Sequence, residues 1–443
     1  MAPGDRKRAR PGLVLRARGA EPAPGPIVVQ GSKNAFNHLA ALALAGRDLS
    51  LRLDGTPPIS DREAVTRILR GAGLEPRLEG NDLLTEGSPV RPHIDVRAGR
   101  QLRASICHAA ALAANVGRAM CPFPGGDAFT ARPIDLHLRT LAAAGAESKQ
   151  SPDGASLAIR FPYRPRAFEV SLTTRYGPSM GASVTALLVA AQASGASTLR
   201  GLSPEPEVSA VAANLRALGV EIETLDHDVV RVRGVDGPLS GRLRAMVPPD
   251  RTEAATYLLV GALRQCVTSL VGIGAAEFTA GLGDVLVMLG LRLGGPVDGG
   301  PATTAVRTPL RPVSVTTGPY PQFPTDVQPP MTALLTQVHG LSWVTERVYA
   351  SRVSHVPELA RLGVRVGVNG ADQYVLGRQR VRGGHALVRD IRCGAALLVA
   401  AAAADAPVTL HDPAGHLARG YGDLRAKLAH VGMDLEDVHD PGA

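Results

Sequence analysis

The sequence predicts an α/β fold built from six copies of one unit, each about seventy residues long. A Leu-x-x-x-Gly pattern recurs along the chain. At five of its six occurrences it ends a helix-like apolar period and runs into a short strand-like segment, such as GVEIETL or GVRVGVNG. Such even spacing over the whole chain indicates a structural repeat. The leucines are Leu69, Leu141, Leu215, Leu286, Leu359 and Leu428, at spacings of 72, 74, 71, 73 and 69 residues.

The glycine of each pattern is expected to end a helix. The residue after a helix often takes a left-handed conformation, which side chains with a β-carbon disfavour. Two of the helices, within 181–195 (GASVTALLVAAQASG) and 393–405 (CGAALLVAAAAAD), have little polar surface. A helix without a polar face is normally buried. We therefore expect these two helices in the protein interior.

A chain of 443 residues is too long for one ordinary core, so two domains of three repeats each are expected. We place one domain at residues 33–249 and the other at 1–32 together with 250–443, with the boundary near VPPDRTEAATYLL. Ligands often bind between two domains. The active site is therefore expected in an interdomain cleft.

Composition narrows the class of ligand. The net charge is +8, but only 3% of the residues are aromatic and no basic block follows the first ten residues, which favours a small anionic substrate over nucleic acid. No apolar stretch reaches the roughly 18 residues of a membrane-spanning helix, and the basic start lacks a signal-peptide core, so we expect a cytoplasmic protein. The scattered cysteines are expected to be reduced thiols, and no spacing implies a metal or organic cofactor.

Lys33 is the first residue that suggests chemistry. Lysine occurs at only three other positions, and Lys33 stands between a Gly-Ser turn and a long apolar run in GSKNAFNHLAALALAG. An ammonium group beside free backbone N–H groups is a suitable cradle for a phosphate. A solvated loop lysine is the ordinary alternative, and this stretch alone does not decide between the two.

Ten motifs together are more specific than any one of them. In order and spacing they resemble the UDP-N-acetylglucosamine enolpyruvyl transferase (1-carboxyvinyltransferase) family over nearly the whole chain. The resemblance implies the enolpyruvyl transferase fold, with two inside-out α/β domains of three βαβαββ repeats each. It also implies two substrates, phosphoenolpyruvate and a uridine nucleotide. The motifs are GSKNA, LRASI, PGGDAFTARPIDLH, GPSMGASV, EPEV, PDRTEAATYL, FPTDVQ, ASRVSHVPELARLG, RDIRCGAALL and ARGYGDL.

The resemblance also assigns binding residues. Arginine binds a carboxylate or a phosphate through two parallel hydrogen bonds. The residues that match the family's site for the phosphate of phosphoenolpyruvate are Lys33, Arg103, Arg132 and Arg419. Those that match its site for the carboxylate are Arg352 and Arg392. ARPIDLH matches the wall that holds the uracil ring. GPSMGAS matches the helix start that meets the nucleotide phosphates, where Ser179 is also a natural N-cap. The residues implied to contact the nucleotide are Asn34, Arg132, Pro133, Ile134, Asp135, Leu136, Ser179, Met180, Gly181 and Asp326.

Two aspartates complete the implied catalytic set, together with Lys33. Asp326 in FPTDVQ matches the base that takes the proton from the attacking hydroxyl. The resemblance places Asp127 on a mobile loop, at a position where the family commonly has cysteine. A carboxyl group can deliver the C3 proton and later remove it. Because fosfomycin alkylates that cysteine, the resemblance implies that this chain resists the drug.

The acceptor stays open. Phe36, Asn37 and His38 depart from the family pattern next to the expected acceptor, and Pro204 and Ser209 depart from it around EPEV. The family default is UDP-N-acetylglucosamine, which accepts at its 3-hydroxyl in peptidoglycan synthesis. The alternative acceptor is UMP, at its 3′-hydroxyl, in a nikkomycin- or polyoxin-like nucleoside antibiotic pathway. A further alternative is that the chain is a non-catalytic nucleotide-binding regulator.

Overall fold

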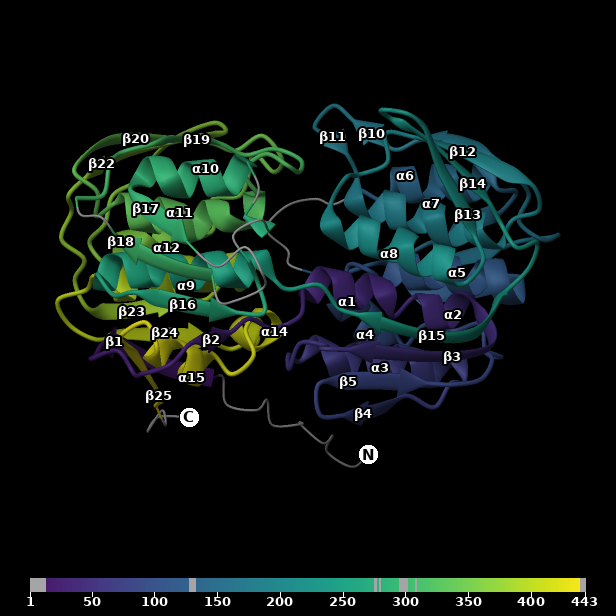
Figure 1. The fold of residues 1–443 in the computed structure, drawn as a ribbon, viewed down its shortest axis with the longest axis horizontal. Coiled ribbons are helices and arrows are strands. Elements are labelled where there is room, and N and C mark those ends of the chain that lie inside the picture. Colours follow the sequence, from purple (N-terminus) through teal and green to yellow (C-terminus); the bar gives the residue numbers. More distant parts are fainter. Residues whose placement is uncertain are drawn as a thin grey trace, which may run out of the picture. The chain divides into compact units, whose positions relative to one another are not determined.

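A computed structural model describes residues 13–126, 133–274, 277–278, 280–294, 302–306 and 309–438. The chain forms two compact units (Figure 1). Unit 1 takes residues 1–28, 252–317 and 323–443, and unit 2 takes 29–251 and 318–322. The boundary expected from the sequence had placed 29–32, 250–251 and 318–322 in the other domain. Gly31 pairs with Pro249 and the Ser32 N–H donates to the Pro248 carbonyl at 2.6 Å, which joins the two boundary segments to each other inside unit 2.

The sheets of unit 2 repeat one strand pattern. In two of them, a first strand runs parallel to a second, and the second pairs antiparallel with a hairpin. The third sheet has the same hairpin, and a single parallel bridge from His93 to Met120 stands in for its first strand. The sheet orders are β15-β3-β5-β4, β6-β8-β7 and β13-β14-β12-β9, beside a small β10-β11 pair. The strands are β3 (Gly46–Asp54), β4 (Arg77–Glu79), β5 (Asp82–Thr85), β6 (Arg118–Pro122), β7 (Glu147–Gln150), β8 (Ser156–Arg160), β9 (Glu169–Ser171), β10 (Thr173–Thr174), β11 (Gly177–Pro178), β12 (Ala196–Arg200), β13 (Glu221–Asp226), β14 (Val229–Arg233) and β15 (Leu239–Met246).

Unit 1 has three sheets of the same pattern, with orders β17-β18-β16-β2, β19-β20-β22-β21 and β23-β24-β1-β25. Strand β1, from the start of the chain, completes the last repeat by pairing between β24 and β25. Strand β15 likewise supplies the first strand of the first repeat in unit 2. The strands are β1 (Leu13–Gly19), β2 (Ile27–Val28), β16 (Thr268–Val271), β17 (Leu291–Gly294), β18 (Ala302–Val306), β19 (Ser314–Thr316), β20 (Gly340–Thr345), β21 (Gly367–Asn369), β22 (Asp372–Gly377), β23 (Gly384–Leu387), β24 (Val408–Asp412) and β25 (Met433–Asp437).

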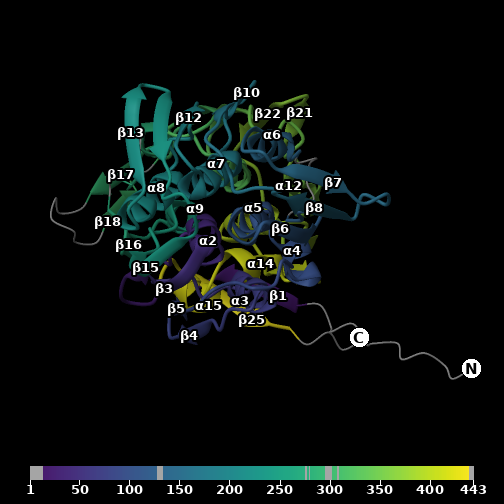
Figure 2. The ribbon, with the colours of Figure 1, turned by 90° about the vertical axis from the view of Figure 1, so that its right-hand side faces the viewer.

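Helices fill the inside of each unit. Figure 2 shows the sheets of unit 2 arranged around α5 and α7. The predicted burial of the helices within 181–195 and 393–405 is confirmed, because every residue from Ala182 to Gln192 and from Ile391 to Ala401 is buried. None of the described helices is long and apolar enough to cross a bilayer. The helices are α1 (Lys33–Leu39), α2 (Leu42–Ala45), α3 (Asp61–Ala72), α4 (Val96–Gln101), α5 (Ser105–Val116), α6 (Asp135–Ala143), α7 (Met180–Gln192), α8 (Pro206–Ala217), α9 (Arg251–Arg264), α10 (Ala280–Leu289), the 3₁₀ turn η2 (Thr325–Val327), α11 (Gln328–Leu335), α12 (His355–Arg361), α13 (Ile391–Ala401), α14 (His416–Gly420) and α15 (Leu424–Ala429).

The repeat predicted from the Leu-x-x-x-Gly pattern is confirmed in local detail. All six leucines are buried. Each repeat glycine has a positive φ, the left-handed conformation that a β-carbon disfavours. At Leu69 the N–H of Leu74 returns to the leucine carbonyl at 3.0 Å, which closes the helix end. The glycines are Gly73 (100°), Gly145 (98°), Gly219 (88°), Gly290 (109°), Gly363 (87°) and Gly432 (73°).

Three buried histidines in unit 2 make stability sensitive to acid. Burial lowers the pKa of His38 to about 3, of His108 to about 4 and of His137 to about 3. Below the unfolded pKa of about 6.5, the unfolded chain binds protons at these positions that the folded chain does not. Stability is therefore present in full above about pH 6.5 and is lost as the pH falls toward the folded pKa values.

We expect each of these histidines to lower the unfolding free energy by about 1.4 kcal/mol per pH unit between about pH 6 and pH 4. Urea unfolding of the full chain at several pH values measures this slope. The Nε2 of His108 lies 2.7 Å from the Asn37 carbonyl. Replacing His108 by glutamine should reduce the slope of unfolding free energy against pH by about 1.4 kcal/mol per pH unit, the contribution of one proton. An unchanged slope in His108→Gln would contradict this account of the acid sensitivity.

Candidate active site

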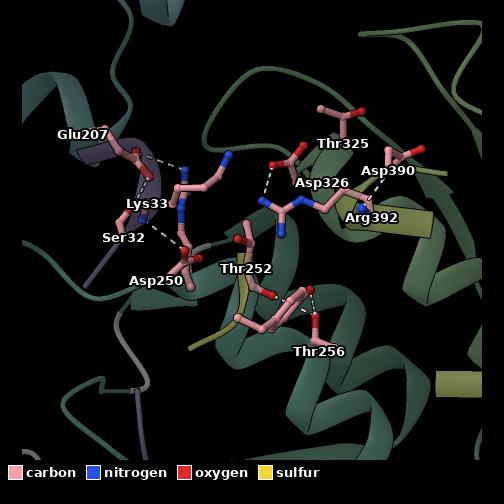
Figure 3. Close-up of polar contacts among 12 residues, drawn as sticks. Ser32, Lys33, Glu207, Asp250, Thr252, Thr256, Thr325, Asp326, Asp390 and Arg392 are labelled. Carbon is pink, nitrogen blue, oxygen red and sulfur yellow. Dashed lines mark hydrogen bonds and ion pairs between the residues drawn. The ribbon is translucent and has the colours of Figure 1, made fainter. Parts of the chain in front are cut away.

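Lys33 begins helix α1 in unit 2 (Figure 3). The Ser32 Oγ caps the helix by accepting from the Ala35 N–H at 3.3 Å. The Ser32 N–H donates to the Pro248 carbonyl at 2.6 Å, and the Lys33 N–H donates to Asp250 Oδ2 at 3.3 Å. The expectation of free backbone N–H groups at this turn is therefore wrong for residues 32, 33 and 35, because segment 248–250 and the cap occupy them. A phosphate at this turn would depend mainly on the half-buried Lys33 side chain, with Asn34, also half-buried, beside it.

The capping residue is held in turn by Glu207 in the first turn of α8. Ser32 Oγ donates to Glu207 Oε1 at 3.3 Å. Arg251 lies 3.5 Å from Glu207 Oε2, forms a second ion pair with Glu205, and has its guanidinium 4.7 Å from the Tyr320 ring centroid. EPEV therefore fixes the segment that carries Lys33. The sequence contained this motif without indicating its role, because no spacing rule links positions 32, 207 and 251.

The segment predicted to form the uracil wall leads into α6. Arg103 Nη2 donates to the Pro133 carbonyl at 2.8 Å, so the LRASI and RPIDLH motifs meet in unit 2. The Asp135 side chain is 61% exposed and accepts from Arg139 Nη2 at 3.3 Å. Ile134 and Leu136 are 5% and 4% exposed and belong to the hydrophobic core. Leu136 thus packs inside the unit, where the resemblance had implied packing against a uracil ring.

The predicted helix start at GPSMGAS is confirmed. Ser179 caps α7, and its Oγ accepts from the Ala182 N–H at 3.4 Å. Met180 and Gly181 are half-buried in the first turn. A β-carbon added at Gly181 would stand 3.2 Å from His137 Cε1, so glycine permits the close approach of α6 to this turn. The N-terminus of a thirteen-residue helix offers N–H groups and a positive dipole end to an anion.

In unit 1, Asp326 lies between Arg352 and Arg392, and Figure 3 shows it beside Arg392. Arg352 Nη1 donates to Asp326 Oδ1 at 2.8 Å, and Arg392 Nη2 donates to Asp326 Oδ2 at 2.6 Å. The side chains of Arg352 and Arg392 are only 3% and 5% exposed, whereas that of Asp326 is 23% exposed. The two arginines assigned to a substrate carboxylate therefore meet at one point, and Asp326 provides the carboxylate there.

A second contact holds the side chain of Arg352 and the backbone of Arg392. Arg352 Nη1 also donates to Thr325 Oγ1 at 2.8 Å, and Thr325 Oγ1 donates to Glu346 Oε2 at 2.8 Å. Glu346 is 1% exposed. The Arg392 N–H donates to Asp390 Oδ1 at 2.8 Å, which caps the long buried helix α13. Sequence reasoning missed the supporting roles of Thr325, Glu346 and Asp390, since each depends on a partner remote in the sequence.

Three further assigned residues are Arg419, Asp127 and Arg132, of which the structure describes only Arg419. Arg419 is half-buried in α14 of unit 1, and two residues later Tyr421 OH lies 2.9 Å from Thr256 Oγ1. Asp127 and Arg132 lie outside the described residues.

The three departures after GSKNA are buried. Phe36, Asn37 and His38 are 0%, 6% and 5% exposed, so they lie in the interior of unit 2. Every residue of α1 from Ala35 to Leu39 is buried, while Lys33 and Asn34 in the first turn stay half-buried.

The chain matches the EPSP synthase (3-phosphoshikimate 1-carboxyvinyltransferase) family over residues 18–428. It belongs to this enolpyruvyl transferase family. The chain is therefore a transferase of the enolpyruvyl type. Known members resemble it from end to end, so the family match is not confined to one unit.

Among its enolpyruvyl transferase relatives is UDP-N-acetylglucosamine 1-carboxyvinyltransferase 3 of Symbiobacterium thermophilum, 35% identical over 96% of this chain and 97% of the relative. The corresponding enzyme of Rhodospirillum centenum is 33% identical over 96% of this chain and 99% of the relative. The crystal structure of the enolpyruvyl transferase NikO from Streptomyces tendae covers 97% of this chain and all of NikO, with a TM-score of 0.86 and 26% identity. EPSP synthase from Acinetobacter baumannii has a TM-score of 0.73 at 17% identity over 96% of this chain, which shows a shared fold alone.

Proposed function

We propose that this chain transfers the enolpyruvyl group of phosphoenolpyruvate to the 3-hydroxyl of UDP-N-acetylglucosamine and releases phosphate. The observation that carries the proposal is the meeting of Arg352 and Arg392 on the carboxylate of Asp326, the candidate base. Phosphoenolpyruvate has a carboxylate for that position and a phosphate for Lys33, Arg103, Arg132 and Arg419. The reaction would supply a peptidoglycan precursor in the cytoplasm.

The proposed chemistry is an addition followed by an elimination. Asp326 takes the proton of the acceptor hydroxyl while the hydroxyl oxygen bonds to C2 of phosphoenolpyruvate. Asp127 gives a proton to C3. The C2–O bond to phosphate then breaks, C3 loses a proton to the Asp127 carboxylate, and the double bond re-forms. The phosphate-side cations stabilise the leaving group. Both aspartates that this scheme needs are present in the chain.

The choice of acceptor rests on the relatives. Two relatives with more than 30% identity over nearly the whole chain are UDP-N-acetylglucosamine 1-carboxyvinyltransferases. The exposed Asp135 carboxylate and the capped start of α7 suit a uracil edge and nucleotide phosphates. UMP is the second candidate, because Pro204 and Ser209 around EPEV depart from the family pattern.

Phosphate release from phosphoenolpyruvate, measured with UDP-N-acetylglucosamine, UMP and shikimate 3-phosphate offered separately, tests the proposal. We expect turnover with UDP-N-acetylglucosamine and none with shikimate 3-phosphate. Turnover with UMP alone would transfer the acceptor assignment to UMP. If neither uridine nucleotide supports phosphate release, the proposed function is wrong.

A further inference from the structure

We propose that Asp326 occupies the donor's carboxylate position, so that only a donor with its own carboxylate can displace it and release it as the base. This inference rests on the proposed function and assigns Asp326 a second role, selection of the donor. Its basis is the geometry around Asp326, whose two oxygens accept from two different guanidinium groups at 2.8 and 2.6 Å. A donor carboxylate would need the same two nitrogens.

The arginines are the fixed part of this arrangement. The guanidinium of Arg352 is also held by Thr325, and the backbone of Arg392 is held in the first turn of α13 by Asp390. Their side chains are almost fully buried, while Asp326 keeps 23% of its side chain exposed. Asp326 is therefore the member of the cluster that an incoming anion can replace. It lies in the short turn η2, whose single turn of 3₁₀ helix leaves it less constrained than a residue inside a long helix.

Displacement would change the chemistry of Asp326. A carboxylate that accepts from two guanidinium groups is a weak base, because the nearby positive charges stabilise its anionic form. When a donor carboxylate takes those two cations, Asp326 loses that stabilisation and binds a proton more readily. The acceptor hydroxyl would then meet a stronger base only when the correct donor is present. A phosphate ester without a carboxylate would leave Asp326 paired with the arginines.

The proposal predicts an unusual binding result. Removing the charge of Asp326 removes the competitor for the arginines, so Asp326→Asn should bind phosphoenolpyruvate at least about tenfold more tightly than the wild-type chain. Its affinity for inorganic phosphate, which does not use this position, should stay the same. Calorimetric titration of both proteins with both ligands measures this. Asp326→Ser, also uncharged but smaller, provides a second test if the asparagine variant does not fold.

Asp54 offers a matched control. It also lies between two arginines, with Arg52 Nε at 2.7 Å and Arg244 Nε at 2.5 Å, but on the sheet of β3 and β15, and neither of these arginines is assigned to the site. Asp54→Asn changes the net charge equally and should leave the phosphoenolpyruvate affinity unchanged. A general effect of charge would tighten binding in both variants.

Unchanged or weaker phosphoenolpyruvate binding in both Asp326 variants would overturn the proposal, as would an equal gain in affinity for inorganic phosphate. These outcomes are separate from a failure of the proposed function, which is judged by turnover of the wild-type chain. Wild-type turnover together with unchanged binding by the Asp326 variants would contradict donor selection alone. Tighter binding without wild-type turnover would support the displaceable position and contradict the proposed reaction.

Discussion

Replacing Asp127 by asparagine is expected to lower turnover by about a thousandfold, since an amide can neither give nor take the C3 proton and positioned acid–base groups contribute about 10² to 10⁴ in rate. Asp127→Cys should retain measurable transfer, because a thiol can carry the same proton. Steady-state phosphate release measures both variants. Full turnover in Asp127→Asn would show that the C3 proton is handled elsewhere.

The same position should control sensitivity to fosfomycin. Burial raises the pKa of Cys107 to about 11 and those of Cys121 and Cys393 to about 12, and it also raises the pKa of Cys266, so the native thiols are protonated and poorly nucleophilic near neutral pH. We therefore expect the wild-type chain to resist the drug and Asp127→Cys to show time-dependent inactivation. Inactivation of the wild type with labelling of a native cysteine would contradict this expectation.

Replacing Arg392 by alanine should lower kcat/KM for phosphoenolpyruvate by about a hundredfold, because one charge-assisted hydrogen bond is worth about 1.5–3 kcal/mol. Arg392→Lys should restore only part of this loss, since an ammonium group keeps the charge but not the planar fork. Arg244 provides the control: it pairs with Asp54 and its side chain is 73% exposed, so Arg244→Ala should leave kcat/KM unchanged. Equal activities of Arg392→Ala and wild type would remove Arg392 from the donor site.

Local rules explain why much of the fold could be predicted. The left-handed glycines after Leu69 and its five counterparts are set by steric limits on the backbone, which a spacing pattern records directly. The burial of α7 and α13 follows from helices without a polar face. The sheet partners of β1 and β15 could not be predicted in this way. Pairing of β1 with β24 and of β15 with β3 joins segments about 200 to 400 residues apart, and no local pattern encodes such partners.

The site shows the same division between local and remote information. The capping role of Ser179 could be inferred from its own neighbours in the sequence. The hydrogen bonds of the Ser32 and Lys33 N–H groups could not be inferred from the local sequence, because their acceptors lie in segment 248–250. The inward position of His38 was also missed, since helix α1 had to be placed against its neighbours before its buried face was known. Remote partners therefore account for most of the corrections.

The central claim is that this chain moves a carboxyvinyl group from phosphoenolpyruvate to a uridine nucleotide. Its most direct test is mass spectrometry of UDP-N-acetylglucosamine after incubation with phosphoenolpyruvate and the wild-type chain, with released phosphate measured in the same sample and Asp326→Asn as the inactive comparison. We predict that the nucleotide gains the mass of one carboxyvinyl group for each phosphate released. Phosphate release without any change in the mass of the nucleotide would contradict the claim.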